Sequence, residues 1–417
     1  MTAERNRVVV VGAGVVGLAC AHYLRQAGCA VTVLDRGAVG QGCSHANCGY
    51  VCPSHVLPFA GPGVIGKTLA TLLQKDSPLT IRFRLDPALW SWMVRFALCC
   101  NRHRMLDAGH AIAALLNSSR QLYAELVGSG GIEAEWQEKG LLFVYRTPAE
   151  MEHYAHTNRL LAETFAMPAQ RYDGDAVSDL EPALVRGLAG GWHYPGDAHL
   201  RPDVLMTSWH AELTRQGVTF HEQRALVGLE TAGRRVTGVV TPQGTVAADA
   251  VVVATGAWTP QLAKHLRCTV PIQPGKGYSI TMARPSRCPA IPIIFEEDRV
   301  AVTPFAGGYR LGSTMEFGGY DETLNRGRLE ILRRAARQYL HEPEAEPVTE
   351  EWWGWRPMVP DGKPIIGRPP RFDNLVVAAG HGMLGLSMAP GTGKLAAELL
   401  TGATPHVDPS PYAVTRF

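Results

Sequence analysis

Short runs of β-branched and aliphatic residues recur along the chain, and glycines directly follow several of them. The run Val8–Val11 leads into GAGVVG at 12–17, after which an amphipathic pattern continues to Gly28. A further apolar run covers 30–34 and closes on an acidic residue. An unbroken apolar run of this length predicts a strand buried in a parallel sheet, and the spacing after the glycines predicts a helix. We therefore expect the order strand, glycine turn, helix, strand.

This order is typical of a dinucleotide-binding turn. Gly12 permits the tight turn, Gly14 lets the backbone approach a pyrophosphate, and Gly17 lets the helix pack closely against the strand. The N–H groups at the start of the helix then favour phosphates. Asp35 ends the second strand, where a carboxylate can bind ribose hydroxyls and disfavours a 2′-phosphate, which Arg36 partly offsets. The predicted ligand is NAD or FAD.

Two more apolar runs end in glycines. Residues 375–379 lead into GHGMLG at 380–385 and a predicted helix over 387–400, but no second strand with a terminal acid follows. We interpret this segment as a glycine turn whose helix N-terminus stabilises the negative charge of a reduced flavin, which favours FAD. The third run, 251–253, precedes ATGAW at 254–258.

These three sites are too far apart for one contiguous domain. The predicted fold class is α/β (α+β overall), with a Rossmann-like FAD-binding domain assembled from discontinuous segments and a substrate-binding domain that has a mixed or antiparallel sheet and helices. The predicted boundaries are 1–60, 196–269 and 346–417 for the FAD-binding domain, and 61–195 and 270–345 for the substrate-binding domain.

Composition narrows the class of protein. The 417 residues are 46% hydrophobic and 19% charged, which excludes a disordered chain. The formal net charge is +2, so nucleic acid is not an expected partner. The nine cysteines lack paired metal-ligand spacing, so no metal site is expected and a reducing compartment is favoured. No apolar run is long enough to span a membrane, and a cytoplasmic location is predicted; the basic and apolar N-terminus leaves a signal peptide as a minor alternative.

Further motifs resemble a known family. Residues 44–49 read SHANCG, 274–279 read PGKGYS, and 355–357 read WRP, followed by DGKPIIG at 361–367. With the three glycine turns, these motifs resemble the D-amino acid oxidase and dehydrogenase family of FAD proteins, which includes glycine and sarcosine oxidases. The similarity is greatest to the bacterial D-amino acid dehydrogenase branch.

The resemblance implies which residues hold the cofactor and the substrate. The expected FAD contacts are Gly12, Gly14, Val15, Val16, Gly17, Asp35, Arg36, Ser44, Ala46, Asn47, Gly49, Val227, Thr255, Gly256, Trp258, Gly380, Gly382, Met383, Leu384 and Gly385. No cysteine follows Cys288, so the flavin is expected to be non-covalent. Arg356 is expected to anchor a substrate carboxylate, with Tyr278 and His55 as further catalytic candidates.

The expected reaction is FAD-dependent oxidative deamination of D-amino acids or cyclic imino acids, such as D-hydroxyproline or D-proline. Hydride would leave the α-carbon for flavin N5, and the electrons would pass to a non-nicotinamide acceptor: a quinone, a protein carrier or dioxygen. Two alternatives stay open. One is a glycine or sarcosine-type oxidase that uses dioxygen, and the other is an electron-transfer subunit of a larger complex.

Aromatic residues gather in the segment 81–100, which contains Trp90, Trp92, Phe96 and Leu98. The favoured interpretation is an ordinary buried helix. The alternative is a helix that rests on the inner face of a membrane and passes electrons to quinone. The sequence leaves the oligomeric state open.

Overall fold

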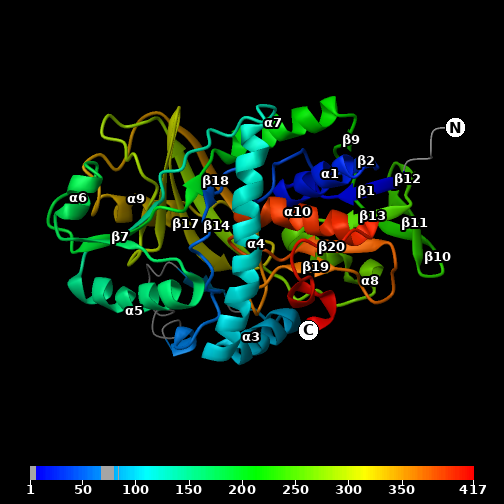
Figure 1. The fold of residues 1–417 in the computed structure, drawn as a ribbon, viewed down its shortest axis with the longest axis horizontal. Helices are drawn as coiled ribbons and strands as arrows, with labels where there is room; N and C mark the ends of the chain where they lie inside the picture. Colours follow the sequence, from blue (N-terminus) through cyan, green and yellow to red (C-terminus); the bar gives the residue numbers. More distant parts are fainter. Residues whose placement is uncertain (1–5, 67–78, 83) are drawn as a thin grey trace.

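Five parallel strands and one antiparallel strand form the first of two main sheets in the computed structural model, which describes residues 6–66, 79–82 and 84–417. The strand order is β19-β20-β13-β1-β2-β9 (Figure 1). The strands are β1 (Arg7–Val11), β2 (Ala30–Leu34), β9 (Thr219–His221), β13 (Ala250–Val253), β19 (Ile365–Gly367) and β20 (Leu375–Ala379). Because β20, β13 and β1 are parallel neighbours, the three predicted glycine turns meet at one edge of this sheet.

Two helices that begin at this edge pack against each other. They are α1 (Val15–Gln26) and α10 (Gly385–Thr401). A Cβ on Gly393 would overlap the Ala19 backbone, so the helices approach more closely than a side chain would allow. The long helix α4 (Arg102–Gly128) crosses α10, where the Gly391 N–H donates to Ser119 Oγ at 2.9 Å (Figure 1).

The second main sheet has nine strands and is mostly antiparallel, as the sequence predicted. Its order is β18-β14-β17-β16-β15-β5-β7-β6, with β4 paired to β17. The strands are β4 (Leu79–Ile81), β5 (Leu141–Tyr145), β6 (Gln170–Asp173), β7 (Gly190–Tyr194), β14 (Gln273–Met282), β15 (Ile293–Phe295), β16 (Val300–Phe305), β17 (Gly308–Phe317) and β18 (Val348–Met358).

Smaller elements complete the described chain. The short strands are β3 (Tyr50–Val51), β8 (Ala198–His199), β10 (Gly228–Ala232), β11 (Arg235–Thr241) and β12 (Gly244–Ala247). The other helices are α3 (Pro87–Cys99), α5 (Pro148–Phe165), α6 (Ala176–Leu180), α7 (Pro202–Arg215), α8 (Ala263–Leu266), α9 (Arg326–Ala336), η1 (Gly256–Leu262), η2 (Ser410–Tyr412) and η3 (Val414–Arg416).

The two main sheets draw on different parts of the chain. The six-stranded sheet takes its strands from 7–34, 219–253 and 365–379. Strand β18, which the predicted boundaries assign to the FAD-binding domain, pairs instead with β14 in the nine-stranded sheet. Residues 67–78 and 83 of the predicted substrate-binding domain lie outside the described residues. The division into two domains stays a prediction.

Helix α3 is buried on one side only. Leu89 and Trp92 are buried, whereas Trp90, Val94 and Leu98 are 43%, 61% and 62% exposed. The exposed three follow one another at four-residue spacing and form a single stripe. The expectation of an ordinary buried helix was therefore incomplete. Within the described part of the chain, no helix combines the length and apolarity needed to cross a membrane.

Candidate active site

Backbone crowding explains the glycines of the N-terminal turn. Gly12 has a φ of +108°, and a Cβ there would overlap the Ala254 carbonyl oxygen. A Cβ on Gly17 would overlap the Gly12 carbonyl oxygen. Helix α1 then starts after Gly14 without a side-chain cap or an acidic residue in its first turn. Such a helix N-terminus can bind a phosphate group through its N–H groups.

Asp35 lies beside this turn at the end of β2. Its Oδ2 accepts from the Ala13 N–H at 2.7 Å, and its Oδ1 accepts from the Gly37 N–H at 2.8 Å. Each oxygen keeps a second lone pair, which can accept a ribose hydroxyl. The Arg36 guanidinium lies over the Trp258 ring, 4.1 Å from its centroid, and this contact brings two predicted segments together. The residues present therefore fit the adenosine end of FAD.

Other predicted cofactor residues differ in how closely they join this site. Ser44 Oγ accepts from the Val15 N–H at 2.9 Å and so connects residues 44–49 to the start of α1. The Thr255 hydroxyl forms a hydrogen bond of 3.0 Å with the Thr259 hydroxyl of η1, and Gly256 begins η1 with a φ of +54°. The Val227 side chain is 49% exposed, and its backbone N–H is bound to β11.

Residues 44–49, here called the flavin loop, are held by the nine-stranded sheet. Three consecutive carbonyl groups, at 46–48, each accept a hydrogen bond from a different strand. Ser279 Oγ donates to the first at 2.8 Å, Arg310 Nη1 to the second at 2.8 Å, and Thr303 Oγ1 to the third at 2.6 Å. The loop is therefore fixed relative to the sheet that carries Arg356.

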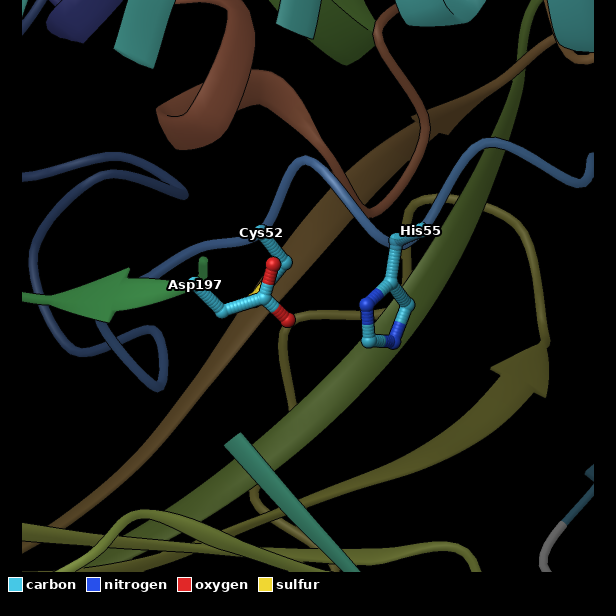
Figure 2. A group of neighbouring side chains, drawn as sticks. All are labelled: Cys52, His55 and Asp197. Carbon is cyan, nitrogen blue, oxygen red and sulfur yellow. The ribbon is translucent and has the colours of Figure 1, made fainter. Parts of the chain in front are cut away.

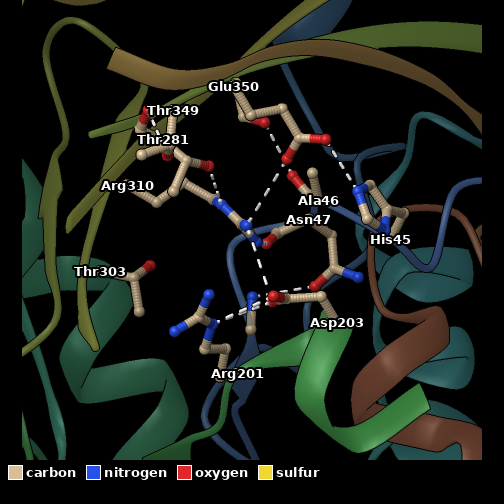
Figure 3. A network of polar contacts seen from close by, with 12 residues as sticks. His45, Ala46, Asn47, Arg201, Asp203, Thr281, Thr303, Arg310, Thr349 and Glu350 are labelled. Carbon is tan, nitrogen blue, oxygen red and sulfur yellow. Dashed lines mark hydrogen bonds and ion pairs between the residues drawn. The ribbon is translucent and has the colours of Figure 1, made fainter. Parts of the chain in front are cut away.

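A charged network surrounds Arg310, which is only 1% exposed (Figure 3). Its Nε donates to Thr281 Oγ1 at 2.9 Å, and its Nη2 lies 3.8 Å from Asp203 and 4.0 Å from Glu350. Glu350 Oε1 is in turn 2.7 Å from His45 Nε2. This hydrogen bond raises the pKa of His45 and lowers the pKa of Glu350, so both groups favour the charged form.

A cavity of about 210 Å³ lies between the flavin loop, strands β14 and β18, and the C-terminal glycine turn. The predicted residues that line it are Ala46, Asn47, Gly49, His55, Tyr278, Arg356, Gly382, Met383 and Leu384. Apolar side chains, among them Trp92 and Phe96 of α3, form much of the remaining wall. The cavity thus brings Arg356 and His55 close to the predicted flavin residues.

Arg356 presents an uncompensated positive charge to this cavity. Its Nη1 donates to the Thr314 carbonyl at 2.7 Å, and no carboxylate of the described residues pairs with the guanidinium. Burial lowers the pKa of Arg356. Ser313 and Thr314 have φ values of +113° and +53°, at a point where the register between β14 and β17 shifts. Thr314, whose carbonyl accepts the hydrogen bond from Arg356, is part of this irregularity. A carboxylate ligand would neutralise the guanidinium.

Tyr278 lies on the other face of the same sheet. Strand β18 pairs Arg356 with Gly275 and Trp353 with Tyr278, and adjacent strand positions point to opposite faces. The Tyr278 hydroxyl donates to Glu316 Oε2 at 2.8 Å within the buried core. The structure therefore does not bring its hydroxyl to Arg356, and a role in holding the carboxylate is not supported by this geometry.

The C-terminal glycine turn forms another part of the cavity wall. Gly380 and Gly382 have φ values of +78° and +55°, and the Gly382 N–H donates to the Pro357 carbonyl at 3.0 Å. His381 Nε2 lies 2.9 Å from Thr392 Oγ1, and burial lowers the pKa of His381 to about 3. Helix α10 begins here at Gly385 with no side-chain cap and no acidic residue in its first turn. Its N-terminus can therefore stabilise negative charge on a flavin.

His55 belongs to a cluster that the sequence did not reveal. Its ligand atom, Cys52 Sγ and a carboxylate oxygen of Asp197 all lie within 4.8 Å of one another (Figure 2). Burial lowers the pKa of His55 to about 4 and raises the pKa of Asp197 to about 7. These three groups are ligands that Zn²⁺ accepts, but both Asp197 oxygens already accept hydrogen bonds from Ser54. The absence of a metal stays a prediction.

Trp352 is a further cavity residue that the motif analysis missed. A Cβ on Gly354 would overlap the Trp352 ring, and a Cβ on Gly277 would overlap the Arg356 guanidinium. The signal for Trp352 is present in the sequence, because residues 352, 354 and 356 alternate onto one face of a strand. Nothing comparable points to Asp197, which lies in a turn between β7 and β8.

Curated relatives align with almost the whole chain. The chain is 36% identical over 408 residues to a D-amino acid dehydrogenase from Methylobacterium nodulans, covering 96% of each protein. It is 34% identical to a D-amino acid dehydrogenase from Xanthobacter autotrophicus, covering 99% of each.

Solved structures share the fold. Glycine oxidase from Geobacillus kaustophilus has a TM-score of 0.80 at 24% identity, and L-proline dehydrogenase from P. horikoshii has a TM-score of 0.74 at 20% identity. The first covers 99% of both chains, and the second covers 99% of this chain and 98% of its own. The family model described as DAO, FAD dependent oxidoreductase, matches residues 7–399. The chain therefore belongs to the DAO family of FAD-dependent oxidoreductases.

Proposed function

We propose that this protein is an FAD-dependent D-amino acid dehydrogenase that oxidises D-amino acids or cyclic imino acids at the α-carbon. The observation that carries the proposal is the Arg356 guanidinium, which faces the cavity without a carboxylate partner among the described residues. The relatives named D-amino acid dehydrogenase, aligned over nearly their full length, support the same substrate class.

The chain's own part in this reaction is orientation. Arg356 would hold the substrate carboxylate through two parallel hydrogen bonds, and the apolar wall formed by Trp92 and Phe96 would accept the side chain. When bound, the flavin supplies the acceptor for the hydride from the α-carbon. The predicted residues of the N-terminal turn, Asp35 and the flavin loop would hold FAD non-covalently. Arg356 and the C-terminal glycine turn both line the cavity, so substrate and flavin would meet within it.

Anaerobic mixing tests the proposal. The purified flavoprotein is combined with D- and L-amino acids, D-proline, D-hydroxyproline, sarcosine and glycine, and loss of the flavin's visible absorbance is followed. Reduction by D-substrates, with slow recovery in air, is expected for a dehydrogenase. Reduction by glycine or sarcosine with fast recovery in air would instead identify an oxidase. A flavin that none of these compounds reduces would overturn the proposal and favour an electron-transfer subunit.

We also propose that the acceptor is a membrane quinone and that α3 lies on the inner, cytoplasmic face of the membrane. Trp90, Val94 and Leu98 form the exposed apolar stripe of α3, and Leu85, just before the helix, is 91% exposed. Arg102 and Arg104 are exposed at the start of the adjoining helix α4 and would attract anionic headgroups. The opposite side of α3 lines the cavity, which would place the reduced cofactor close to the lipid.

Vesicle flotation of the holoenzyme tests the membrane contact. The wild type is expected to float with vesicles that contain phosphatidylglycerol, and the double variant Val94→Asp, Leu98→Asp is expected to stay in the unbound fraction. The matched control, Ala211→Asp with Thr214→Asp, adds the same charge to exposed positions of α7. Equal flotation of all three proteins would contradict the proposal.

A further inference from the structure

Asp197 is a buried carboxylate to which the proposed function assigns no role. It is 1% exposed, and no cation of the described residues forms an ion pair with it. Its Oδ1 accepts from the Ser54 N–H at 3.0 Å and its Oδ2 from the Ser54 hydroxyl at 2.6 Å. A carboxylate held in this way, beside a ligand cavity, can store a proton near neutral pH.

A chain of hydrogen-bonding groups leads from this carboxylate to the cavity. Ser54 Oγ lies 3.5 Å from His55 Nδ1, at the limit of a hydrogen bond, and 2.6 Å from Asp197 Oδ2. His55 lines the same cavity as Arg356, whereas Asp197 does not reach it. A neutral imidazole can accept a proton at one nitrogen while it releases the proton of the other. Burial keeps His55 neutral, which is the state a relay requires.

The proposed oxidation requires that a proton leave the substrate. Free amino acids carry an ammonium group near neutral pH, and the nitrogen lone pair must be free before hydride can leave the α-carbon. Of the three predicted catalytic residues, Arg356 is always charged and the Tyr278 hydroxyl lies within the core. The third, His55, lines the cavity and is the candidate base.

We propose that His55, Ser54 and Asp197 form a relay that removes this proton from the bound substrate. The substrate N–H bond breaks and its proton bonds to His55 Nε2. The Nδ1 proton passes to Ser54 Oγ, whose own proton passes to Asp197 Oδ2. No electron is transferred in this step, and the carboxylate ends as a neutral acid that returns its proton to solvent after turnover. This inference rests on the proposed function. His55 is the group that touches substrate, and Asp197 acts through it.

The groups that face Asp197 come from three elements. Cys52 and His55 lie in the segment after β3, Tyr194 belongs to β7, and Arg120 approaches from α4. The Arg120 charge lowers the pKa of Asp197, but burial dominates and raises it to about 7. The Asp197 carboxylate is therefore ionised and able to accept a proton above about pH 7, and it is already protonated below that pH.

Stopped-flow reduction of the holoenzyme by a D-amino acid, measured from pH 6 to pH 10, tests the relay. The wild-type rate is expected to rise with pH through about 7, the pKa of Asp197. In Asp197→Asn and in Ser54→Ala the rise of the rate through pH 7 is expected to vanish. The reduction rate near pH 8 is expected to fall about tenfold or more. The three rates are expected to converge at alkaline pH, where the free substrate amine has already lost its proton.

Glu181→Gln is the matched control. Glu181 is equally enclosed, at 2% exposed; its oxygens accept backbone N–H groups, and it does not line the cavity. The dependence of the reduction rate on pH in Glu181→Gln should match that of the wild type. An unchanged profile in Asp197→Asn, or a loss of the same size at every pH, would overturn the relay while leaving the proposed function intact. Failure of every D-amino acid to reduce the wild-type flavin would overturn both.

Discussion

A glycine determines where the Arg356 guanidinium lies. A Cβ on Gly277 would overlap the guanidinium, so the absence of a side chain at 277 lets Arg356 lie flat over the neighbouring strand. The Thr314 carbonyl then fixes one nitrogen, and the cavity side of the guanidinium stays available for a ligand. The site therefore depends on a residue that carries no functional group.

We expect Gly277→Ala to weaken substrate binding with little effect on the fold. The methyl group would displace the Arg356 guanidinium, and KM for a D-amino acid should rise about tenfold, which corresponds to about 1.4 kcal/mol. Steady-state kinetics and the binding of benzoate, a carboxylate without an oxidisable amine, provide the measurement. The control is Gly308→Ala in the same sheet, whose Cβ would make only ordinary van der Waals contacts with Met282 and Thr281. Equal effects of the two substitutions would contradict the role assigned to Gly277.

At the scale of elements, local signals were predictable and contacts between distant strands were not. The strand, turn and helix at 7–26 follow from residues adjacent in sequence, and the structure confirms them. The face on which the Tyr278 side chain lies could not be predicted, because it depends on the β14–β18 register, which pairs residues about 75 positions apart. Asp197 was missed for the same reason, since only folding brings its turn to Ser54.

The contact between α1 and α10 gives a prediction at this scale. Gly393→Ala should lower the free energy of unfolding of the holoenzyme by about 1–3 kcal/mol, because the added methyl overlaps the Ala19 backbone. Denaturant unfolding followed by circular dichroism measures the loss. Gly128→Ala, at the end of α4 with nothing near its Cβ, should leave stability unchanged or slightly higher. Two equal losses would show that the helix contact is not the cause.

For the whole molecule, His45 and Glu350 connect the flavin loop to the outer strand of the nine-stranded sheet. Their side chains are 24% and 32% exposed. The lowered pKa of Glu350 means that its stabilising contribution is present above its unfolded value of 4.5 and is lost as pH falls through the folded pKa. The raised pKa of His45 means that its contribution is complete below 6.5 and is lost as pH rises through the folded pKa.

The pair should therefore stabilise the protein most between about pH 4.5 and 6.5, by up to about 1 kcal/mol. Unfolding free energies of the wild type and His45→Gln, compared at pH 5.5 and pH 8.5, test this. Their difference should be larger at pH 5.5. The exposed His103 at the start of α4 provides the control His103→Gln, which should show no such trend. A pH-independent effect of His45→Gln would refute the ion pair.

The three hydrogen bonds that hold the carbonyls at 46–48 also set an order of events during synthesis. The donors follow their acceptors by 233 to 263 residues, so the ribosome completes the N-terminal glycine turn long before Ser279, Thr303 and Arg310 exist. A nascent chain can build its first strand, turn and helix, but it has no shaped loop for the flavin ring. If residues 44–49 hold the flavin as proposed, cofactor capture depends on donors that are synthesised late, and a prematurely terminated chain lacks them.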